Sequence, residues 1–393
     1  MKQGWEIKNL GEVCDFENGD RGVNYPSKSH RTKTGIPFIN AGHLTSNGID
    51  ISNMDFISRD RYNLLSNGKI QKGDILFCLR GSLGKYANVG ELSEGAIASS
   101  LVIVRPKPVV IRAFIMAYFG SRICAEMIIM HSNGAAQPNL SAQSLRKFQI
   151  PIPPLPEQQR MVAILDEAFA AIAKAKANTE QNLKNARELF ESYLQSVFTN
   201  KGKGWENKTL NQISENLDSR RVPITHNVRK KGSVPYYGAS GIVDYVEDYL
   251  FDDDLLLVSE DGANLLARTY PIAFSIKGKS WVNNHAHILK FKNLASQKFV
   301  EYYLNSIKLD DYVSGMAQPK LNQKMLNSII IPFPSLIEQQ AIIDNLNVFS
   351  EKTNKLEVIY QKRLNCLENL KKSILQKAFA GELRGSDLIY KNR

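Results

Sequence analysis

The chain repeats itself, and this repeat constrains its fold more than any other feature of the sequence. Residues 136–140 (AQPNL) return as residues 317–321 (AQPKL), and residues 150–153 (IPIP) return as residues 331–334 (IPFP), both at an offset of 181 positions. The same offset carries on into the Glu-Gln-Gln run that follows each proline-rich segment. Because self-similarity at a fixed offset indicates a duplicated structural unit, we expect two copies of one module.

A second match shows where the two copies differ. Residues 4–10 (GWEIKNL) match residues 204–210 (GWENKTL) at an offset of 200, so the second copy is 19 residues shorter between the two matches. Within this stretch, residues 19–48 have no clear counterpart. The same frame with different inserts suits two modules that recognise different things.

Each copy ends in a pattern typical of a long helix. No Pro or Gly interrupts residues 157–198, and apolar residues recur there at steps of three and four, which predicts a helix of roughly 60 Å with one apolar stripe. The second copy repeats the stripe from Ile342 to Ala378, with Lys371 as an obvious misfit beside Leu370. Two such stripes are buried most simply by pairing, and we expect an antiparallel coiled coil. A helical hairpin that serves only as a core remains the alternative.

This order of elements predicts four segments. Residues 1–156 and 204–337 form two globular domains, while residues 157–203 and 338–393 form two long helices, the second with a C-terminal tail. The fold class is therefore α+β, with an internal pseudo-two-fold repeat. Antiparallel pairing predicts one globular domain at each end of a rod.

Both globular segments have a mixed α and β pattern. Strands are predicted at residues 75–79, 101–104, 255–258 and 287–289, separated by Gly, Asn and Asp turns. Helices are predicted at residues 112–130 and 297–312, upstream of each repeated Gln-Pro element. Each module should therefore combine a small sheet with a packed helix.

The charge of the chain favours a polyanionic partner. The formal net charge is +11, and Lys or Arg that neutralise phosphates release condensed counterions. In the first domain the candidate DNA-binding residues lie in a basic loop, in the turn after a strand, and in the repeated Gln-Pro element: Arg21, Lys28, His30, Arg31, Lys33, Arg80, Ser82, Lys85 and Gln137.

The second domain has a different set of polar loops. Its candidate DNA-binding residues are Arg220, Arg221, Arg229, Lys230, Lys231, Tyr236, Tyr237, Asn283, Asn284, His285, Gln318 and Lys320. Arg and Lys suit phosphates and guanine edges, Asn and Gln suit adenine edges, and aromatic rings can stack on bases. For each cluster, a loop that is merely solvated is the alternative.

Sequence motifs of catalysis are missing. The chain has no glycine-rich methyltransferase loop, no Asn/Asp-Pro-Pro-aromatic site and no nuclease-like carboxylate cluster, and residues 81–86 (GSLGKY) lack the spacing of a P-loop and are expected to form a turn. His285 and His287 have no third metal ligand nearby in sequence, so we expect no metal site. Four dispersed cysteines indicate reduced, mostly buried thiols, and the lack of an apolar leader predicts a cytoplasmic protein.

Taken together, the doubled motifs resemble the specificity subunits of type I restriction-modification systems over essentially the whole chain. The resemblance rests on residues 150–159 and 331–340, on Ala-Gln-Pro upstream of each, and on the Gly-Trp-Glu that opens each half. It implies two target recognition domains that each read one half of a split, asymmetric DNA site. Ser335 and Ile337 depart from the pattern, since they replace Pro154 and Pro156.

The resemblance also implies partners and an absence of chemistry in this chain. The paired helices would hold methyltransferase subunits, two in number, which bind S-adenosylmethionine and methylate adenine, and a restriction subunit would use ATP and Mg²⁺ in translocation and cleavage. The chain itself would bind no cofactor and catalyse nothing. A helical interaction scaffold or an antirestriction-like decoy is the rival interpretation.

Overall fold

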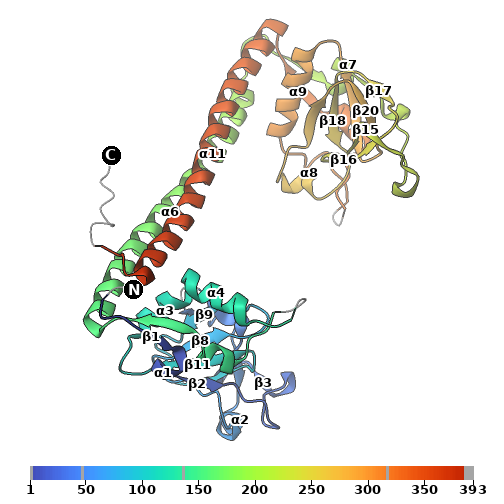
Figure 1. Ribbon diagram of the computed structural model, residues 1–393. Coiled ribbons are helices and arrows are strands. Elements are labelled where there is room, and N and C mark those ends of the chain that lie inside the picture. The colour runs from blue at the N-terminus through green and yellow to red at the C-terminus, as the bar shows by residue number, and fades with distance from the viewer. Residues whose placement is uncertain (1–2, 46–47, 135–137, 316–317, 385–393) are drawn as a thin grey trace. The chain divides into compact units, whose positions relative to one another are not determined.

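The computed structural model describes residues 3–45, 48–134, 138–315 and 318–384. The chain divides into two compact units: a first unit of residues up to Thr179 together with those from Arg363 onward, and a second unit of Glu180–Lys362. Each unit contains one globular domain and part of both long helices (Figure 1). The long helices are α6 (Leu155–Thr199) and α11 (Leu336–Ala380), and each has 45 residues.

The first unit is built on a sheet that is buried on both faces. Its strand order is β2 (Cys14–Asn18), β11 (Leu101–Pro106), β8 (Ile75–Cys78) and β9 (Tyr86–Asn88), all antiparallel. Alternate residues of β8 point to opposite faces: Ile75 and Phe77 join the helix-covered core, whereas Leu76 and Cys78 join a second core beneath the loops. This explains why β8 reads as an unbroken apolar run rather than as an alternating one.

A smaller sheet in the first unit includes two strands, β3 (Arg31–Thr32) and β4 (Ile36–Ile39), from the segment that the repeat does not share. Its order is β10 (Ala96–Ile97), β4, β7 (Asp55–Ile57) and β3, and β10 pairs with β4 in parallel. The remaining elements of the unit are β1 (Glu6–Asn9), α1 (Leu10–Val13), η1 (Lys28–His30), η2 (Ala41–His43), β5 (Leu44–Thr45), β6 (Gly48–Ile49), α2 (Arg59–Leu64), α3 (Arg112–Phe119), α4 (Arg122–His131), α5 (Ala142–Arg146) and β12 (Gln149–Ile152).

The second unit repeats this plan. Its main sheet has the order β14 (Ser214–Asn216), β21 (Ala286–Phe291), β18 (Leu255–Ser259) and β19 (Ala273–Ile276), and its smaller sheet has the order β16 (Gly241–Val246), β15 (Lys231–Gly238), β20 (Lys279–Val282) and β17 (Phe251–Asp252). The other elements are β13 (Glu206–Thr209), α7 (Leu210–Ile213), η3 (Asp218–Arg220), η4 (His226–Val228), α8 (Asn264–Ala267), α9 (Leu294–Ser306), α10 (Gln323–Ser328) and β22 (Ile330–Phe333). The predicted strands are confirmed to within two residues at each end.

The predicted helices are confirmed with two differences. The helix predicted at residues 297–312 is α9, which begins at Leu294 and ends at Ser306. The pattern at residues 112–130 is two helices rather than one, because α3 stops at Gly120 and Ser121 then caps α4 by accepting from the Cys124 backbone N–H. The two helices meet at a bend of 63°. No single helix of the described residues is long and apolar enough to cross a membrane, and this bent pair passes that test by length and composition only.

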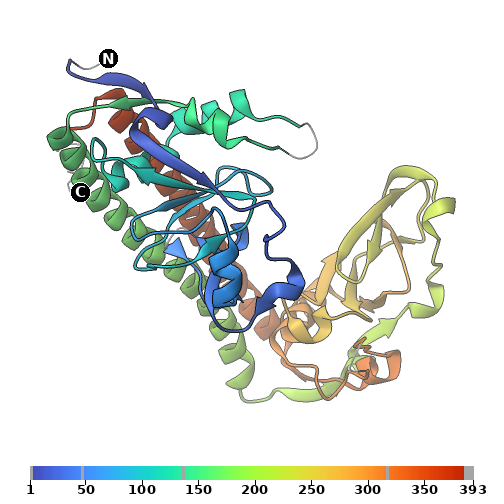
Figure 2. The same cartoon turned by 90° about the horizontal axis from the view of Figure 1, so that it is seen from below.

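The long helices run antiparallel, as predicted. In the first unit, Arg160 donates to the Leu383 carbonyl at 3.1 Å and Lys176 lies 2.8 Å from Glu368. In the second unit, Arg187 lies 2.9 Å from Glu357 and the Tyr193 and Phe349 rings are 4.6 Å apart. Figure 2 shows the first part of α6 beside the last part of α11. Lys371 is the polar residue that interrupts the apolar stripe of α11. Its ammonium lies 5.0 Å from the centre of the Phe169 ring on α6.

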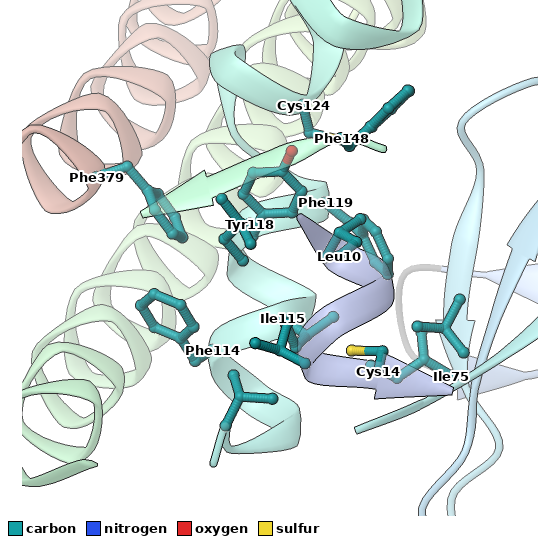
Figure 3. Close-up of a cluster of buried hydrophobic side chains, with 14 of the residues drawn as sticks. Leu10, Cys14, Ile75, Phe114, Ile115, Tyr118, Phe119, Cys124, Phe148 and Phe379 are labelled. Carbon is teal, nitrogen blue, oxygen red and sulfur yellow. The ribbon is translucent and has the colours of Figure 1, made fainter. Parts of the chain in front are cut away.

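The helices are also part of the domain cores, so they are more than a connection. In the first unit, Phe379 of α11 packs against Phe114 and Tyr118 of α3, with ring centres 5.2 Å and 5.9 Å apart (Figure 3). Phe198 of α6 contacts Phe299 of α9 in the second unit at 5.4 Å. Burial of a large apolar side chain stabilises a fold by roughly 1.5–3 kcal/mol, so each domain is held firmly to its helices.

Candidate nucleic-acid interface

The two domains build the same surface feature at matching positions. In the first domain, Asn139 forms β-bridges both to Arg80, in the turn after β8, and to Asn133. In the second domain, Lys320 forms the same bridges to Asp261 and Ser314, each partner displaced by 181 positions. The sequence repeat is therefore also a repeat of backbone hydrogen bonding. We call these residues the bridge pairs: Arg80 with Asn139, and Asp261 with Lys320.

The bridge pair of the first domain opens into a polar depression of about 300 Å³. Arg80 is exposed and its Nε donates to Asn139 Oδ1 at 3.2 Å. Arg21 also reaches this depression, and its guanidinium donates to the Ser99 carbonyl at 3.3 Å. The other polar lining residues are Asn18, Asn133, Ser141 and Gln143. Amide and guanidinium groups gathered in one hollow suit hydrogen bonding to base edges.

The remaining candidates of the first domain divide by what they contact. Arg31 is half-buried, paired with Asp55 at 2.6 Å, and lies over the Phe38 ring, so its guanidinium is already used inside the domain. His30 receives contacts from Ser27 and Arg61. Lys28, Lys33 and Ser82 are exposed. Residues 81–85 form the predicted turn between β8 and β9, where Lys85 donates to the Ala41 carbonyl at 3.2 Å. The last candidate, Gln137, lies outside the described residues.

In the second domain, the candidate residue Arg221 is mostly buried. Arg221 is the counterpart of Arg21 at the offset of 200, and it donates to the Asn284 carbonyl as Arg21 donates to that of Ser99. Unlike Arg21, it lies 2.5 Å from Glu260 and its side chain is only 15% exposed. The guanidinium therefore joins an internal ion-pair network instead of facing solvent.

The network of Arg221 is centred on a buried histidine. His287 Nδ1 lies 2.5 Å from Asp218, and its Nε2 lies 2.7 Å from the Leu321 carbonyl. Burial raises the pKa of the Asp218 carboxyl, but the hydrogen bond and charge of His287 outweigh burial, and the net pKa is below its usual value. The pKa of Glu260 is also lowered overall, against burial, by Arg221 and His287. Lys320 joins the edge of this network at 3.2 Å from Glu260.

Other candidates of the second domain are placed both inside and outside the fold. Tyr236 is buried, with 1% exposure, and Arg229 covers its ring at 4.3 Å while pairing with Asp244, so neither presents the free group that base stacking or phosphate binding needs. Asn283 is also buried, where its side chain accepts from the His285 backbone. Tyr237 is half-buried against Phe274. The exposed candidates are Arg220, Lys230, Lys231, Asn284, His285, Gln318 and Lys320.

Sequence reasoning missed five polar residues of the first depression and one acid of the second domain. The five residues that line the depression are Asn18, Asn133, Asn139, Ser141 and Gln143. In the second domain, Asp261 holds His285 at 2.8 Å beside Lys320. The sequence repeat would have indicated Asp261, because position 261 lies 181 residues after Arg80. An acidic residue was passed over in a search for phosphate contacts, although carboxylates accept hydrogen bonds from cytosine. Among the described residues, no group of His, Cys, Asp and Glu is arranged to hold a metal ion.

The repeated Glu-Gln-Gln motif fixes each long helix to its domain. Gln158 is fully buried at the start of α6, where it accepts from the Ile111 backbone N–H at 3.0 Å and donates to the Pro153 carbonyl at 2.9 Å. Gln339 occupies the same place in α11, donating to the Pro334 carbonyl and accepting from Ser296 Oγ, both at 2.8 Å. The two helices begin at equivalent residues even though Ser335 replaces Pro154.

The fold and the two polar bridge surfaces define a class of protein: two recognition modules of common design and different surface chemistry, carried on one pair of helices. The comparisons with known proteins agree. Residues 2–185 and 202–367 match the family described as type I restriction modification DNA specificity domain. The chain belongs to this family.

Individual relatives carry descriptions that agree with this family. A putative type I restriction enzyme specificity subunit of Haemophilus influenzae is 32% identical over 44% of this chain and 43% of its own length. A putative specificity subunit, MjaX, of Methanocaldococcus jannaschii is 23% identical over 98% of this chain and 95% of its own length. The EcoKI specificity subunit of Escherichia coli K12 is 22% identical over 98% of this chain and 90% of its own length.

Two solved structures share the fold. A chain from a structure of complex assembly and conformational transition of the type I R-M system superimposes with a TM-score of 0.80 at 19% identity, covering 98% of this chain and 99% of that one. The HsdS subunit from Thermoanaerobacter tengcongensis superimposes with a TM-score of 0.59 at 20% identity and covers 98% of both chains.

Proposed function

We propose that this chain is the DNA sequence-specificity subunit of a type I restriction-modification complex, and that each domain reads one half of a split, asymmetric site. The observation that carries this proposal is the pair of equivalent bridges with different side chains. One backbone frame that presents different hydrogen-bonding groups in its two copies would select two different half-sites. Base contacts specify sequence, while the exposed lysines around them position the protein on phosphates.

The long helices support a second part of the proposal, which is assembly with catalytic partners. In the second unit, Leu189 on α6 and Val348, Val358 and Ile359 on α11 are each more than half exposed. Apolar side chains left on the outside of a helical pair favour further helices packing there. Two methyltransferase subunits and one restriction subunit fill this role in the proposal, and the assembly works in the cytoplasm.

Under this proposal the chain binds DNA and partners but performs no catalytic step. S-adenosylmethionine is bound by the methyltransferase subunits, and ATP and Mg²⁺ by the restriction subunit. What this chain supplies is position: the two domains select a site, and the helices bring the partners to it.

The test is methylome sequencing of a host that lacks other DNA methyltransferases. The host receives the methyltransferase subunit with this chain, and in a parallel culture without it. The expected result is N6-methyladenine in one split, asymmetric motif, present only with this chain. A complex that assembles but methylates no defined motif would contradict the proposal.

A further inference from the structure

The two bridge pairs have the same backbone bridge but different side-chain chemistry. Arg80 in the first domain is replaced by Asp261 in the second, and Asn139 is replaced by Lys320. We propose that these pairs are specificity-determining positions, at which each domain distinguishes one base pair of its half-site. The inference rests on the proposed function and assigns residues to it.

The bridge backbone is fixed firmly enough for this role. Beside each bridge, the Leu140 N–H donates to the Leu79 carbonyl at 3.0 Å, and the Leu321 N–H donates to the Glu260 carbonyl at 2.8 Å. The following glycines, Gly81 and Gly262, have φ of +78° and +110°, and a Cβ at either would meet nothing within 4 Å. Backbone conformation, and not crowding, therefore requires glycine there. Discrimination between bases needs groups held on such a rigid frame.

Exposure separates the bridge pairs from the three arginine candidates that are paired inside the domains. The guanidinium groups of Arg31, Arg221 and Arg229 are each paired with a carboxylate inside a domain. Arg80 and Asn139 are exposed, and the Lys320 side chain is 53% exposed. The bridges thus offer charged and polar groups that are both fixed at the backbone and open to a ligand.

In the first domain the bridge pair presents mainly donors. Arg80 Nε donates to Asn139 Oδ1, and the amide NH₂ of Asn139 adds two further N–H donors to those of the guanidinium. The two terminal amino groups of the guanidinium have no partner among the hydrogen bonds of the described residues. In the major groove, guanine presents two acceptors, O6 and N7, whereas adenine presents a donor at N6. A surface of donors favours guanine, so Arg80 reads guanine.

In the second domain the bridge pair combines an acceptor with a donor. Asp261 holds His285 Nδ1 at 2.8 Å and keeps a partly exposed carboxylate, while Lys320 lies beside it with its ammonium 3.2 Å from Glu260. A carboxylate accepts from the exocyclic amine of cytosine or adenine and repels the acceptors of guanine. The second domain therefore reads an exocyclic amine at the position where the first reads guanine.

The experiment uses the complete chain with its methyltransferase subunits. Methylation is measured on a plasmid library randomised across both half-sites, for the wild type, Arg80→Ala, and the matched control Arg122→Ala. Arg122 is an exposed arginine of the same domain, and it pairs with Glu126 on its own helix. One bidentate contact discriminates by roughly ten- to a hundredfold. Arg80→Ala should lose that much preference for guanine at one position, with the second half-site and the Arg122→Ala motif unchanged.

The second half-site in the same chain reports folding, because a misfolded variant would lose both. Asn139→Ala should weaken the same position partially, and Asp261→Ala should relax one position of the second half-site only. An Arg80→Ala motif identical to the wild-type motif, with uniformly weaker methylation and a smaller salt dependence, would show a phosphate contact and overturn the inference. Methylation lost on every sequence by an assembled complex would also overturn it.

The two levels of the proposal fail differently. A wild-type complex that methylates no split motif contradicts the proposed function, and the inference falls with it. A wild-type split motif that neither bridge variant relaxes contradicts the inference alone.

Discussion

The side chain of Gln158 accepts a hydrogen bond from the backbone N–H of Ile111 at 3.0 Å, and so ties the first turn of α6 to the loop before α3. The same amide donates to the carbonyls of Pro153 and Val109. One fully buried side chain thus satisfies three backbone groups.

Replacement of this glutamine should destabilise the first unit. Gln158→Leu leaves the Ile111 N–H and the carbonyls of Pro153 and Val109 without this partner, and loss of the partner of a buried polar group costs about 1–3 kcal/mol. We expect a drop of roughly 2–4 kcal/mol in the free energy of unfolding of the first unit, measured by urea denaturation followed by hydrogen exchange of α3 amides. Gln159→Leu, at the exposed neighbouring position, is the control and should change stability little. Equal stability of the two variants would show that the buried amide has no anchoring role.

Acid should weaken the second unit through its buried carboxylates. The pKa of Asp218 is lowered from 3.8 and that of Glu260 from 4.5, so in the acid range the unfolded chain binds more protons than the folded one. The stabilisation is present above about pH 4.5 and is lost as the pH falls through the lowered values. Asp218→Asn should flatten this dependence, as measured by the unfolding midpoint of the second unit from pH 6 to pH 3. Exposed Asp252 provides the control variant Asp252→Asn, which should keep the wild-type slope.

Exposed and internally paired cations should respond differently to mutation. Lys33→Ala should weaken DNA binding on all sequences and reduce the salt dependence of log K by about 1, because a phosphate contact releases counterions. Arg31→Ala should mainly lower stability, since Arg31 is paired with Asp55 inside the domain. Binding to cognate and scrambled duplexes at several salt concentrations distinguishes the two. An unchanged salt slope for Lys33→Ala would remove it from the interface.

Both long helices pass from one unit into the other without a break, which makes helix length a testable variable. A helical turn advances about 5.4 Å. Insertion of four residues into α6 together with four into α11 should therefore lengthen the gap between half-sites by one or two base pairs. The methylated motif should keep both half-sites and change only its spacer. An unchanged spacer in an active variant would contradict the idea that the helices set this distance.

The division into two domains and two long helices could be predicted from the sequence, because both copies of the repeat show the same order of elements. The offset of 181 located both long helices, and unbroken apolar runs such as residues 75–78 located strands buried on two faces. The break between α3 and α4 was missed, because Gly120 and Ser121 interrupt an apolar pattern that otherwise continues. Short strands of two residues, such as β10, depend on their partners and leave no periodic signal of their own.

The candidate interface was predicted less completely, for a physical reason. Residue type shows what a side chain can bind but not whether another side chain already binds it. Arg221 and Arg80 look alike in sequence, yet Arg221 meets Glu260 inside the fold and Arg80 is exposed. Tyr236 has an aromatic ring that could stack on a base, but this ring is buried in the core of the domain. The DNA-contact assignments, including those of the exposed lysines, remain predictions.

The last turns of α11 complete the core of the first unit, where Phe379 fills the space between Phe114 and Tyr118. During synthesis, this N-terminal domain must therefore wait for side chains made more than 200 residues later before its core closes. Genetic exchange of one domain between related chains is constrained in the same way: a transplanted first domain would also need a compatible surface at the far end of the second helix.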